Sequence, residues 1–249
     1  MNKLSLLFIL LLITGLSRSG YCDWKYQFSE DLNSDGKKES ILVTFTGQNE
    51  RDEHDYKITI DDAVYEGRFP YDGVVSAEVV DIDLHDKQKE LLLRFDGQTD
   101  DVIDNYFIYD NGIVKIAEIP GSSYSEIPGN GVVTMNEWMG FWSRDKKYKL
   151  EGKYLVPVRE EYKLDVDSKV SNIMVLYTNP SYRAEVSASL LQDMIIKLKA
   201  VKVFSDSCTT SDGYTHECEW YYIEAENGAS GWIEYNDLIL STMDLPWAG

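Results

Sequence analysis

Apolar and polar residues alternate along most of the chain, a pattern typical of half-buried β-strands. The alternation is clear in Tyr56–Ile60 and in Tyr106–Tyr109. Turn-forming pairs separate such runs, and Asn111-Gly112 is the strongest hairpin signal because both residues tolerate positive φ. The pattern predicts an all-β fold in which nearly every element from Trp24 to about Val158 is a strand.

Two acidic loops, each leading directly into an apolar strand-like run, indicate a repeated unit. Residues 31–40 precede Ile41–Phe45, and residues 81–90 precede Leu91–Phe95. A third unit from Gly131 to Val158 keeps the strand pattern but lacks the acidic loop. Three or four strands in about fifty residues are typical of propeller blades, and three units are too few to close a ring. The sequence therefore predicts an incomplete, propeller-like stack of antiparallel units.

A charged segment, residues 159–169, is the best candidate for a domain boundary. We therefore predict a blade-like β-repeat domain over residues 23–160 and a small barrel over residues 165–249. Residues 186–191 suggest a short helical turn within the C-terminal region. Strand-like runs follow it at residues 195–204, 219–224 and 230–234.

The first acidic loop has the spacing of a calcium-binding loop. Calcium takes about six to eight oxygen ligands, and alternate side chains can wrap one side of the ion while a glycine permits the turn. The predicted ligands are Asp31, Asn33, Asp35, the carbonyl of Lys37, and Glu39. Strand formers follow Glu39 and the glutamate comes early, which argues against an EF-hand. The alternative is a capped turn, in which the Asp and Asn side chains accept backbone N–H bonds.

The D-x-N-x-D-G-x-x-E pattern before a strand resembles the calcium loops of FG-GAP and VCBS blade repeats. The resemblance covers residues 29–45 well and the second unit loosely, and it implies blades with structural calcium. The second loop departs from the pattern at His85, Asp86 and Lys89. A cation there would need a different ligand set: Asp81, Asp83 and either Asp86 or Glu90. A capped turn is therefore the favoured interpretation of the second loop.

Four sequence features follow one another near the C-terminus. They are Leu-Tyr-Thr-Asn-Pro-Ser at residues 176–181, an aromatic strand at 220–224, an Asn-Gly turn followed by Gly-Trp-Ile at 227–233, and Leu238. In this order they resemble a bacterial SH3-like (SH3b) domain over roughly residues 170–240. The resemblance implies a small barrel and, as in many relatives, binding of cell-wall peptides or glycans. The insertion at residues 205–217 is longer than usual.

The aromatic residues of this region are its candidates for ligand binding: Tyr177, Trp220, Tyr222 and Trp232. Packing in or beside the barrel core is the favoured interpretation of the two tryptophans. A second aromatic group, Trp138, Phe141 and Trp142, lies close together between glycines. It is either an exposed stacking platform or, as we favour, a core for the third unit and its contact with the barrel.

The first residues have the pattern of a secretory signal peptide. Lys3 precedes an apolar run from Leu4 to Thr14, which is shorter than the roughly 20 residues that a membrane-spanning helix needs. We predict that residues 1–22 are a signal peptide and that the mature chain has no transmembrane segment. The protein would be secreted or associated with the cell envelope. A lipid anchor on Cys22 is disfavoured because the bulky Tyr21 precedes it.

Three cysteines leave an odd count. Export favours a disulfide between Cys208 and Cys218, while Cys22 is either removed with the signal or left at the new terminus. Such a short disulfide loop would stabilise the fold by about 2–3 kcal/mol.

The chain is strongly acidic, with a formal net charge of -19. An excess of this size repels nucleic acid and favours divalent cations. The three histidines have no metal-ligand spacing, and the nucleophile and phosphate-loop motifs of common enzymes do not occur. We therefore expect a secreted, non-enzymatic protein that recognises peptidoglycan or a cell-envelope peptide or protein. The alternatives are a wall-targeted hydrolase and a partner or inhibitor of another exported protein.

Overall fold

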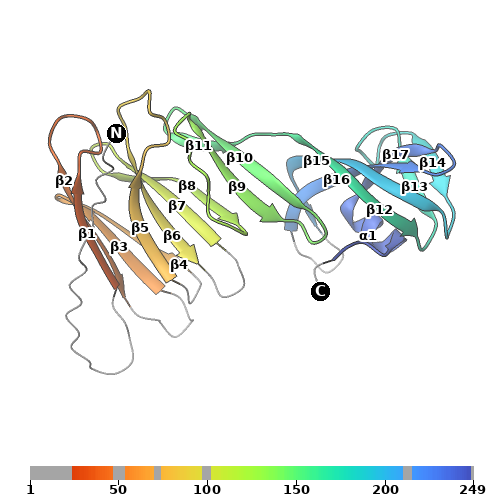
Figure 1. Ribbon diagram of the computed structural model, residues 1–249, viewed down its shortest axis with the longest axis horizontal. Coiled ribbons are helices and arrows are strands. Elements are labelled where there is room, and N and C mark those ends of the chain that lie inside the picture. The colour runs from red at the N-terminus through yellow and green to blue at the C-terminus, as the bar shows by residue number, and fades with distance from the viewer. Residues whose placement is uncertain (1–23, 47–53, 70–73, 97–101, 210–214, 248–249) are drawn as a thin grey trace, which may run out of the picture.

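The computed structural model describes residues 24–46, 54–69, 74–96, 102–209 and 215–247. Within them the chain is all-β apart from one short helix, as predicted, and its sheets succeed one another along an elongated molecule (Figure 1). The predicted signal peptide, residues 1–22, and Cys22 lie outside the described residues. The helix that is described falls short of the length and apolar character needed to cross a membrane.

The first two sheets have the same four-stranded antiparallel order. The first contains β1 (Trp24–Glu30), β2 (Glu39–Thr46), β3 (His54–Ile60) and β4 (Ala63–Phe69). The second contains β5 (Val74–Val80), β6 (Glu90–Asp96), β7 (Val102–Tyr109) and β8 (Ile113–Gly121). Consecutive strands are neighbours in both, and an acidic loop joins the first strand to the second. The two acidic loops therefore occupy equivalent places in two equivalent sheets.

The third sheet is smaller and is formed by β9 (Val132–Trp138), β10 (Ser143–Glu151) and β11 (Tyr154–Pro157). Residues 122–126 run along the free side of β9, where Glu126 and Thr134 exchange both backbone hydrogen bonds. This segment takes the place that a first strand has in the other sheets. Glu126 is the single acid between β8 and β9, so the third unit lacks an acidic loop, as predicted.

The three sheets pack face to face through two hydrophobic clusters. Val43 and Phe95 belong to the cluster between the first and second sheets. Leu92 and Met135 belong to the cluster between the second and third sheets. The second sheet is thus buried on both faces, and this is why Leu91–Leu93 of β6 are all buried, whereas in the equally apolar run Ile41–Val43 of β2 the middle residue, Leu42, is partly exposed.

Both end faces of this stack are polar. On the first sheet, Thr44 and the exposed Lys57 are paired neighbours that point away from the second sheet. On the third sheet, Asp145 and Lys149 are exposed on the face away from the second sheet. A fourth sheet at either end would have to bury these groups, so the described stack ends with the third sheet.

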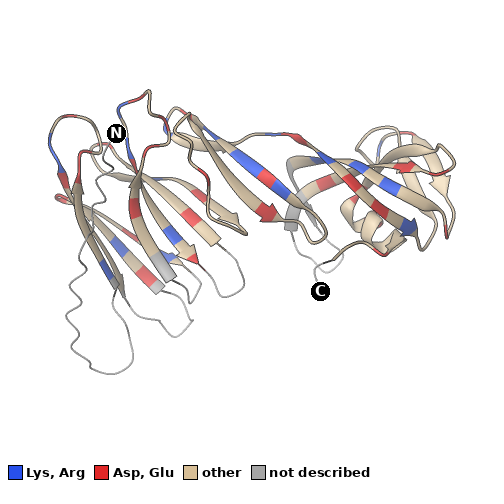
Figure 2. Cartoon of the chain, in the orientation of Figure 1, with Lys and Arg blue, Asp and Glu red and all other residues tan. Residues whose placement is uncertain are grey.

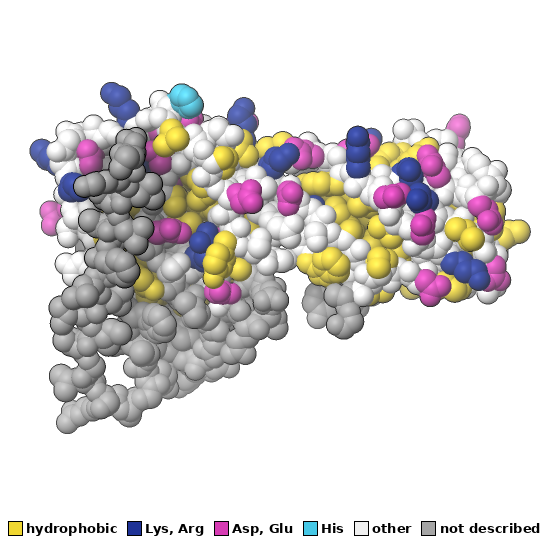
Figure 3. Space-filling model, in the orientation of Figure 1, with side chains coloured by type: hydrophobic (Ala, Val, Ile, Leu, Met, Phe, Trp, Pro, Cys, Tyr) yellow, Lys and Arg dark blue, Asp and Glu magenta, His cyan; other side chains and the backbone are white. Residues whose placement is uncertain are grey.

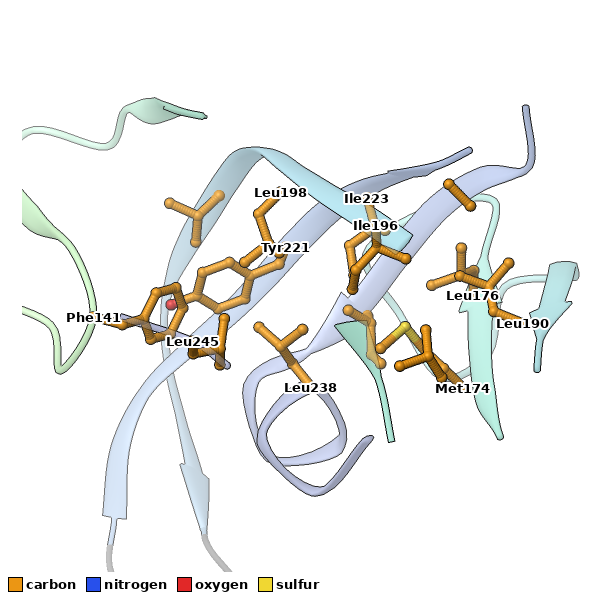
Figure 4. Packing of buried hydrophobic residues seen from close by; sticks show 14 of the residues in the cluster. Phe141, Met174, Leu176, Leu190, Ile196, Leu198, Tyr221, Ile223, Leu238 and Leu245 are labelled. Carbon is orange, nitrogen blue, oxygen red and sulfur yellow. The ribbon is translucent and has the colours of Figure 1, made fainter. Parts of the chain in front are cut away.

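The C-terminal part is a seven-stranded antiparallel sheet with the order β14-β13-β17-β16-β15-β12-β18. The sheet curls around one hydrophobic core, which the helix α1 also covers (Figures 1 and 4). Its elements are β12 (Glu161–Val170), β13 (Met174–Tyr177), β14 (Val186–Leu190), β15 (Ile195–Thr209), β16 (Thr215–Ala225), β17 (Ser230–Glu234), α1 (Tyr235–Ser241) and β18 (Thr242–Met243).

The structure differs from the sequence-based expectation at three C-terminal elements. The helical turn predicted at residues 186–191 is wrong: Val186–Leu190 is β14, whose pairing with β13 buries Leu190. The helix α1 was not predicted, and the Glu234 carboxylate accepts the Asn236 N–H at its start. The charged segment at the predicted boundary forms β12.

The charges of β12 conceal an alternating pattern. Tyr162, Leu164 and Val166 pack against the C-terminal core, while the charged residues between them are exposed. Figure 2 marks the charged positions along β12. Period-two alternation is the signature of a strand with one buried face. The segment therefore belongs to the C-terminal sheet.

The turn between β9 and β10 joins the third sheet to the C-terminal core. Phe141 and Trp142 are both buried in that core, and the Phe141 ring points at Tyr221 (Figure 4). The Trp142 indole N–H donates to the Tyr221 hydroxyl at 3.0 Å, and that hydroxyl donates to the buried Glu219 at 2.5 Å. The aromatic group is therefore a contact with the C-terminal sheet, as favoured from the sequence, and only Trp138 of its members is exposed.

Equivalent leucines in the first two sheets allow the double burial of the second sheet to be tested. Leu93 is fully buried, whereas Leu42, at the equivalent position of β2, lies on the polar end face. We expect Leu93→Ala to lower the free energy of unfolding by about 2–5 kcal/mol, and Leu42→Ala by less than about 1 kcal/mol. Urea denaturation followed by far-UV circular dichroism measures both values. Similar losses for the two variants would contradict the packing order.

Candidate functional site

The first acidic loop is closed by its own side chains. The Asp31 carboxylate accepts the N–H of Asp35 at 3.2 Å and that of Gly36 at 3.0 Å. Asn33 Oδ1 accepts the Asp35 N–H at 3.0 Å, and Asp35 Oδ1 accepts the Lys37 N–H at 2.7 Å. Gly36 has a φ of 88°, which glycine adopts without strain. This is the capped turn, and because each carboxylate oxygen keeps a second lone pair, it is compatible with cation coordination.

Glu39 completes this loop from the start of β2. Its carboxylate is buried and accepts the Leu32 N–H at 2.8 Å. Oxygen atoms of Asp31, Asp35 and Glu39 lie within 4.8 Å of one another, the one such group of acids, histidines or cysteines in the described part of the chain. Calcium–oxygen distances of about 2.3–2.6 Å place ligand atoms up to about 5 Å apart. The spacing of these three predicted ligands therefore fits a calcium ion.

The second acidic loop repeats the first with one residue inserted. Asp83 Oδ1 accepts the His85 N–H at 3.1 Å, and Asp86 Oδ1 accepts the Gln88 N–H at 2.7 Å. Glu90 Oε2 accepts the Ile82 N–H at 3.0 Å, as Glu39 does for Leu32. Asp86 therefore corresponds to Asp35, which a position-by-position comparison of the sequences misses. Among the described residues, the acids of this loop do not gather into a group that could share one ion.

A regular backbone contact links each unit to the next. The Leu32 carbonyl accepts the Lys89 N–H at 2.8 Å and a side-chain N–H of Gln88 at 3.0 Å. In the same way the Ile82 carbonyl accepts the Gly131 N–H at 2.7 Å. Leu32 and Ile82 are thus held at their N–H by their own loop's glutamate and at their carbonyl by the following unit.

Glu90 is an acid in an unfavourable environment for its charge. Its side chain is 1% exposed, and burial raises its pKa to about 7, although the Ile82 N–H opposes the shift. The pKa of Asp81 is also raised, first by burial and then by the neighbouring Asp86. One carboxylate oxygen of Asp81 is buried without a hydrogen-bond partner. Protonation therefore relieves an unfavourable charge at Glu90 and at Asp81.

Three of the four predicted ligand-binding aromatics form a row across the outer face of the C-terminal sheet, the face opposite its core. Tyr177 of β13 pairs with Trp232 of β17, and Trp232 pairs with Tyr222 of β16. All three are partly exposed and lie outside the core cluster. The Tyr222 and Trp232 ring centroids are 5.3 Å apart, and the Lys202 ammonium lies 4.7 Å from the Trp232 ring centroid. The structure thus brings these three residues together on one face.

Trp220, the fourth predicted aromatic, is buried but lies outside the core cluster. Its ring lies on the outer face under two tyrosines, 6.0 Å from the Tyr177 ring and 5.1 Å from the Tyr182 ring between centroids. Only 5% of the residue is exposed, so it forms a floor and offers little contact surface of its own. Tyr182, which the sequence did not single out, is 55% exposed above it.

The predicted disulfide lies at the edge of the described structure. In the β15–β16 hairpin, Cys208 pairs through its backbone with His216, and Cys218 with Phe204. Cys218 is buried, whereas the side chain of Cys208 lies outside the described residues. The Cys208–Cys218 bond stays a prediction.

The described histidine side chain and the surface charge distribution add no further site. His85 is highly exposed and contacts Asp83 at 3.1 Å, while the side chains of His54 and His216 lie outside the described residues. Basic side chains on the face shown in Figure 3 lie singly among acidic ones. Nucleic acid needs a continuous basic surface, which the described part of this face does not offer.

Comparisons with known proteins give no match to a protein-family model, to a curated protein or to a solved structure. The acidic loops and the aromatic row are the features of the molecule that indicate a function.

The raised pKa of Glu90 makes stability depend on pH. The unfolded chain releases this proton near the ordinary pKa of 4.5, whereas the folded chain keeps it until about pH 7. The stabilisation from the protonated carboxyl is therefore full below about pH 4.5 and is lost as the pH rises to about 7. We expect Glu90→Gln to remove a fall of about 1–3 kcal/mol across this window. Urea denaturation at several pH values in a chelator measures it, and parallel wild-type and variant curves would refute it.

Proposed function

We propose that this chain is a secreted or envelope-associated, non-enzymatic binding protein that recognises peptidoglycan or a cell-envelope peptide or protein. The observation that carries the proposal is the row of Tyr177, Trp232 and Tyr222 on the outer face of the C-terminal sheet. Aromatic side chains on a rigid sheet offer flat contact area at a small cost in conformational entropy. Sugar rings and peptide side chains both pack on such a surface.

The proposed architecture assigns different tasks to the two parts. The stacked sheets are interpreted as blade-like units of an open, propeller-like array, and the curled sheet as an SH3-like barrel that carries the ligand face. The polar end faces of the stack support an open array, and the single curled core supports a barrel. The burial of Phe141 and Trp142 in that core supports a fixed presentation of the ligand face.

The same proposal includes one structural calcium ion in the first acidic loop. Asp31, Asp35 and Glu39 would hold it, and the Asn33 side chain and the Lys37 carbonyl lie in the same loop. A divalent cation there would offset the repulsion among three carboxylates near the start of the chain. The role is structural because the carboxylates lie between two strands, with their oxygens also engaged by loop N–H groups.

Calcium should stabilise the protein through the first loop. At a concentration of about 100 times its dissociation constant, calcium binding would add about 2.7 kcal/mol and raise the melting temperature by about 5 °C or more. We expect Asp35→Ala to abolish this shift and the equivalent second-loop variant, Asp86→Ala, to keep it. Differential scanning fluorimetry with calcium and with a chelator measures the shift. Equal shifts in wild type and Asp35→Ala would remove the ion from this loop.

The aromatic row should govern binding. We expect Trp232→Ala and Tyr222→Ala each to weaken retention on purified cell-wall material or an envelope protein by about tenfold or more, because buried aromatic contacts dominate such interfaces. Sedimentation with wall material and a pull-down from envelope extract measure retention, and circular dichroism checks the fold. Tyr154→Ala is the matched control, since Tyr154 is an exposed aromatic on the third sheet. Unchanged retention of both outer-face variants would count against the proposal.

A further inference from the structure

We infer that Asn111 is a modification site, whose side-chain amide is hydrolysed to a carboxylate in the folded protein through attack by the backbone nitrogen of Gly112. The chain has three Asn-Gly pairs, at residues 111–112, 130–131 and 227–228. Glycine favours the reaction because it has no Cβ to hinder the close approach of its backbone. All three asparagines are exposed, so their hydrogen bonds have to distinguish them.

The reaction needs only water as a co-reactant. The Gly112 nitrogen loses its proton to hydroxide and forms a bond to the side-chain carbon Cγ of Asn111. The bond between Cγ and the amide nitrogen breaks, and that nitrogen leaves as ammonia after taking a proton from water. One water molecule then opens the five-membered succinimide, at the side-chain carbonyl to give aspartate or at the backbone carbonyl to give isoaspartate. The net change is amide plus water to carboxylate plus ammonium, and no atom is oxidised or reduced.

The attacking nitrogen is hydrogen-bonded in two of the three pairs. The Gly131 N–H donates to the Ile82 carbonyl at 2.7 Å, and the Gly228 N–H donates to the Ala225 carbonyl at 2.9 Å. A donated N–H gives up its proton less readily, and its nitrogen has to leave the hydrogen bond before it can attack. The fold therefore protects Asn130 and Asn227.

The Gly112 nitrogen has no such restraint. Among the described residues, no carbonyl or side chain accepts the Gly112 N–H, and the Asp110 N–H instead donates to the Gly112 carbonyl at 3.0 Å. Gly112 lies in the turn between β7 and β8, and a Cβ added to it would meet no atom within 4 Å. Base and the neighbouring side chain can therefore both reach this nitrogen.

The asparagine side chains differ in the same direction. The Oδ1 atoms of Asn130 and Asn227 accept the N–H of the residue two positions on, at 3.1 and 2.9 Å, which holds each side chain in its own turn. Asn111 makes no such bond among the described residues. Its Nδ2 donates to Asp110 Oδ1 at 3.1 Å, on the exposed surface. Its side chain is thus the least restrained of the three.

The product would alter the contact between the second and third sheets. A carboxylate at position 111 cannot donate a hydrogen bond to Asp110, so an attractive contact becomes a repulsion between two neighbouring acids. Asp110 is also paired with Lys153, in the turn between β10 and β11. Asp110 and Lys153 line one cavity together with the buried Glu90. The modification therefore adds negative charge where these two sheets meet.

The test is an incubation of the whole chain at mildly alkaline pH, with and without denaturing urea, followed by peptide mapping with mass spectrometry. In the folded chain we expect Asn111 to lose its amide about tenfold faster than Asn130 and Asn227, since releasing a donated N–H costs about as much energy as changes a rate tenfold. In urea the three sites should react at similar rates. The two protected pairs are thus controls within the same molecule.

Three results would overturn the inference. They are an Asn111 that keeps its amide in the folded chain, a folded-state rate at Asn130 or Asn227 equal to that at Asn111, and a difference among the sites that persists in urea. The last result would assign the difference to the neighbouring sequence and not to the fold.

A pair of variants tests the effect of the product. Asn111→Asp should lower the melting temperature by about 2 °C, because it replaces a hydrogen bond to Asp110 by charge repulsion. Asn227→Asp keeps an oxygen that accepts the Ala229 N–H and should leave the melting temperature unchanged. Differential scanning fluorimetry measures both, and equal melting temperatures would overturn the effect assigned to the product.

Discussion

The arrangement of the stacked sheets depends on the backbone of one residue in each acidic loop. Leu32 and Ile82 are buried, and each donates its N–H to the glutamate that opens the next strand, while its carbonyl accepts an N–H of the unit that follows. A buried residue has to satisfy both backbone groups, and here the two partners come from different sheets. The loop conformation and the spacing between units are therefore fixed together. An ion pair between Lys89 and Glu30 at 2.7 Å joins the same two units beside this contact.

Double burial distinguishes the middle sheet from its neighbours. Leu91, Leu92 and Leu93 are all buried because β6 has a hydrophobic cluster on each side. The flanking sheets bury one face each, and their other faces include polar side chains such as Thr44 and Lys57 on the first sheet and Asp145 and Lys149 on the third. Because the two end faces of the stack are polar, they can remain in contact with water. The stack therefore needs neither a further sheet nor closure into a ring to cover them.

The sequence predicted most of the strands, the two equivalent acidic loops and the missing third one, because alternation and turn residues act locally. The sequence-based prediction failed where tertiary contacts determine the secondary structure or the alignment of the two loops. Val186–Leu190 is short and contains mostly small residues, and its hydrogen-bonded pairing with β13 makes it a strand. Residues 161–170 look like a linker until Leu164 and Val166 are seen against the C-terminal core. The equivalence of Asp86 with Asp35 was hidden by one inserted residue, and only the hydrogen bonds restore the alignment.

The same limit applies to the candidate sites. The aromatic residues of the outer face were found from their types and order, but the burial of Trp220 depends on Tyr182, which comes from a loop across the sheet. The meeting of Tyr182 with Glu234 and Asp237 joins positions more than 50 residues apart in the sequence. No local pattern could have indicated it. Contacts between residues so far apart in the sequence are found only in the folded structure, in which the curled sheet brings them together.

The turn between β9 and β10 makes the two parts of the chain depend on each other. The C-terminal core takes Phe141 and Trp142 from the third sheet, and Gly140 leaves just enough space for the Trp247 ring. These side chains are synthesised before any strand of the curled sheet, because synthesis runs from the N-terminus. A chain that begins at residue 165 would lack both of them, would uncover part of the buried Tyr221 and would lose the hydrogen bond from Trp142. The ligand face is therefore complete only in a chain that includes the third sheet.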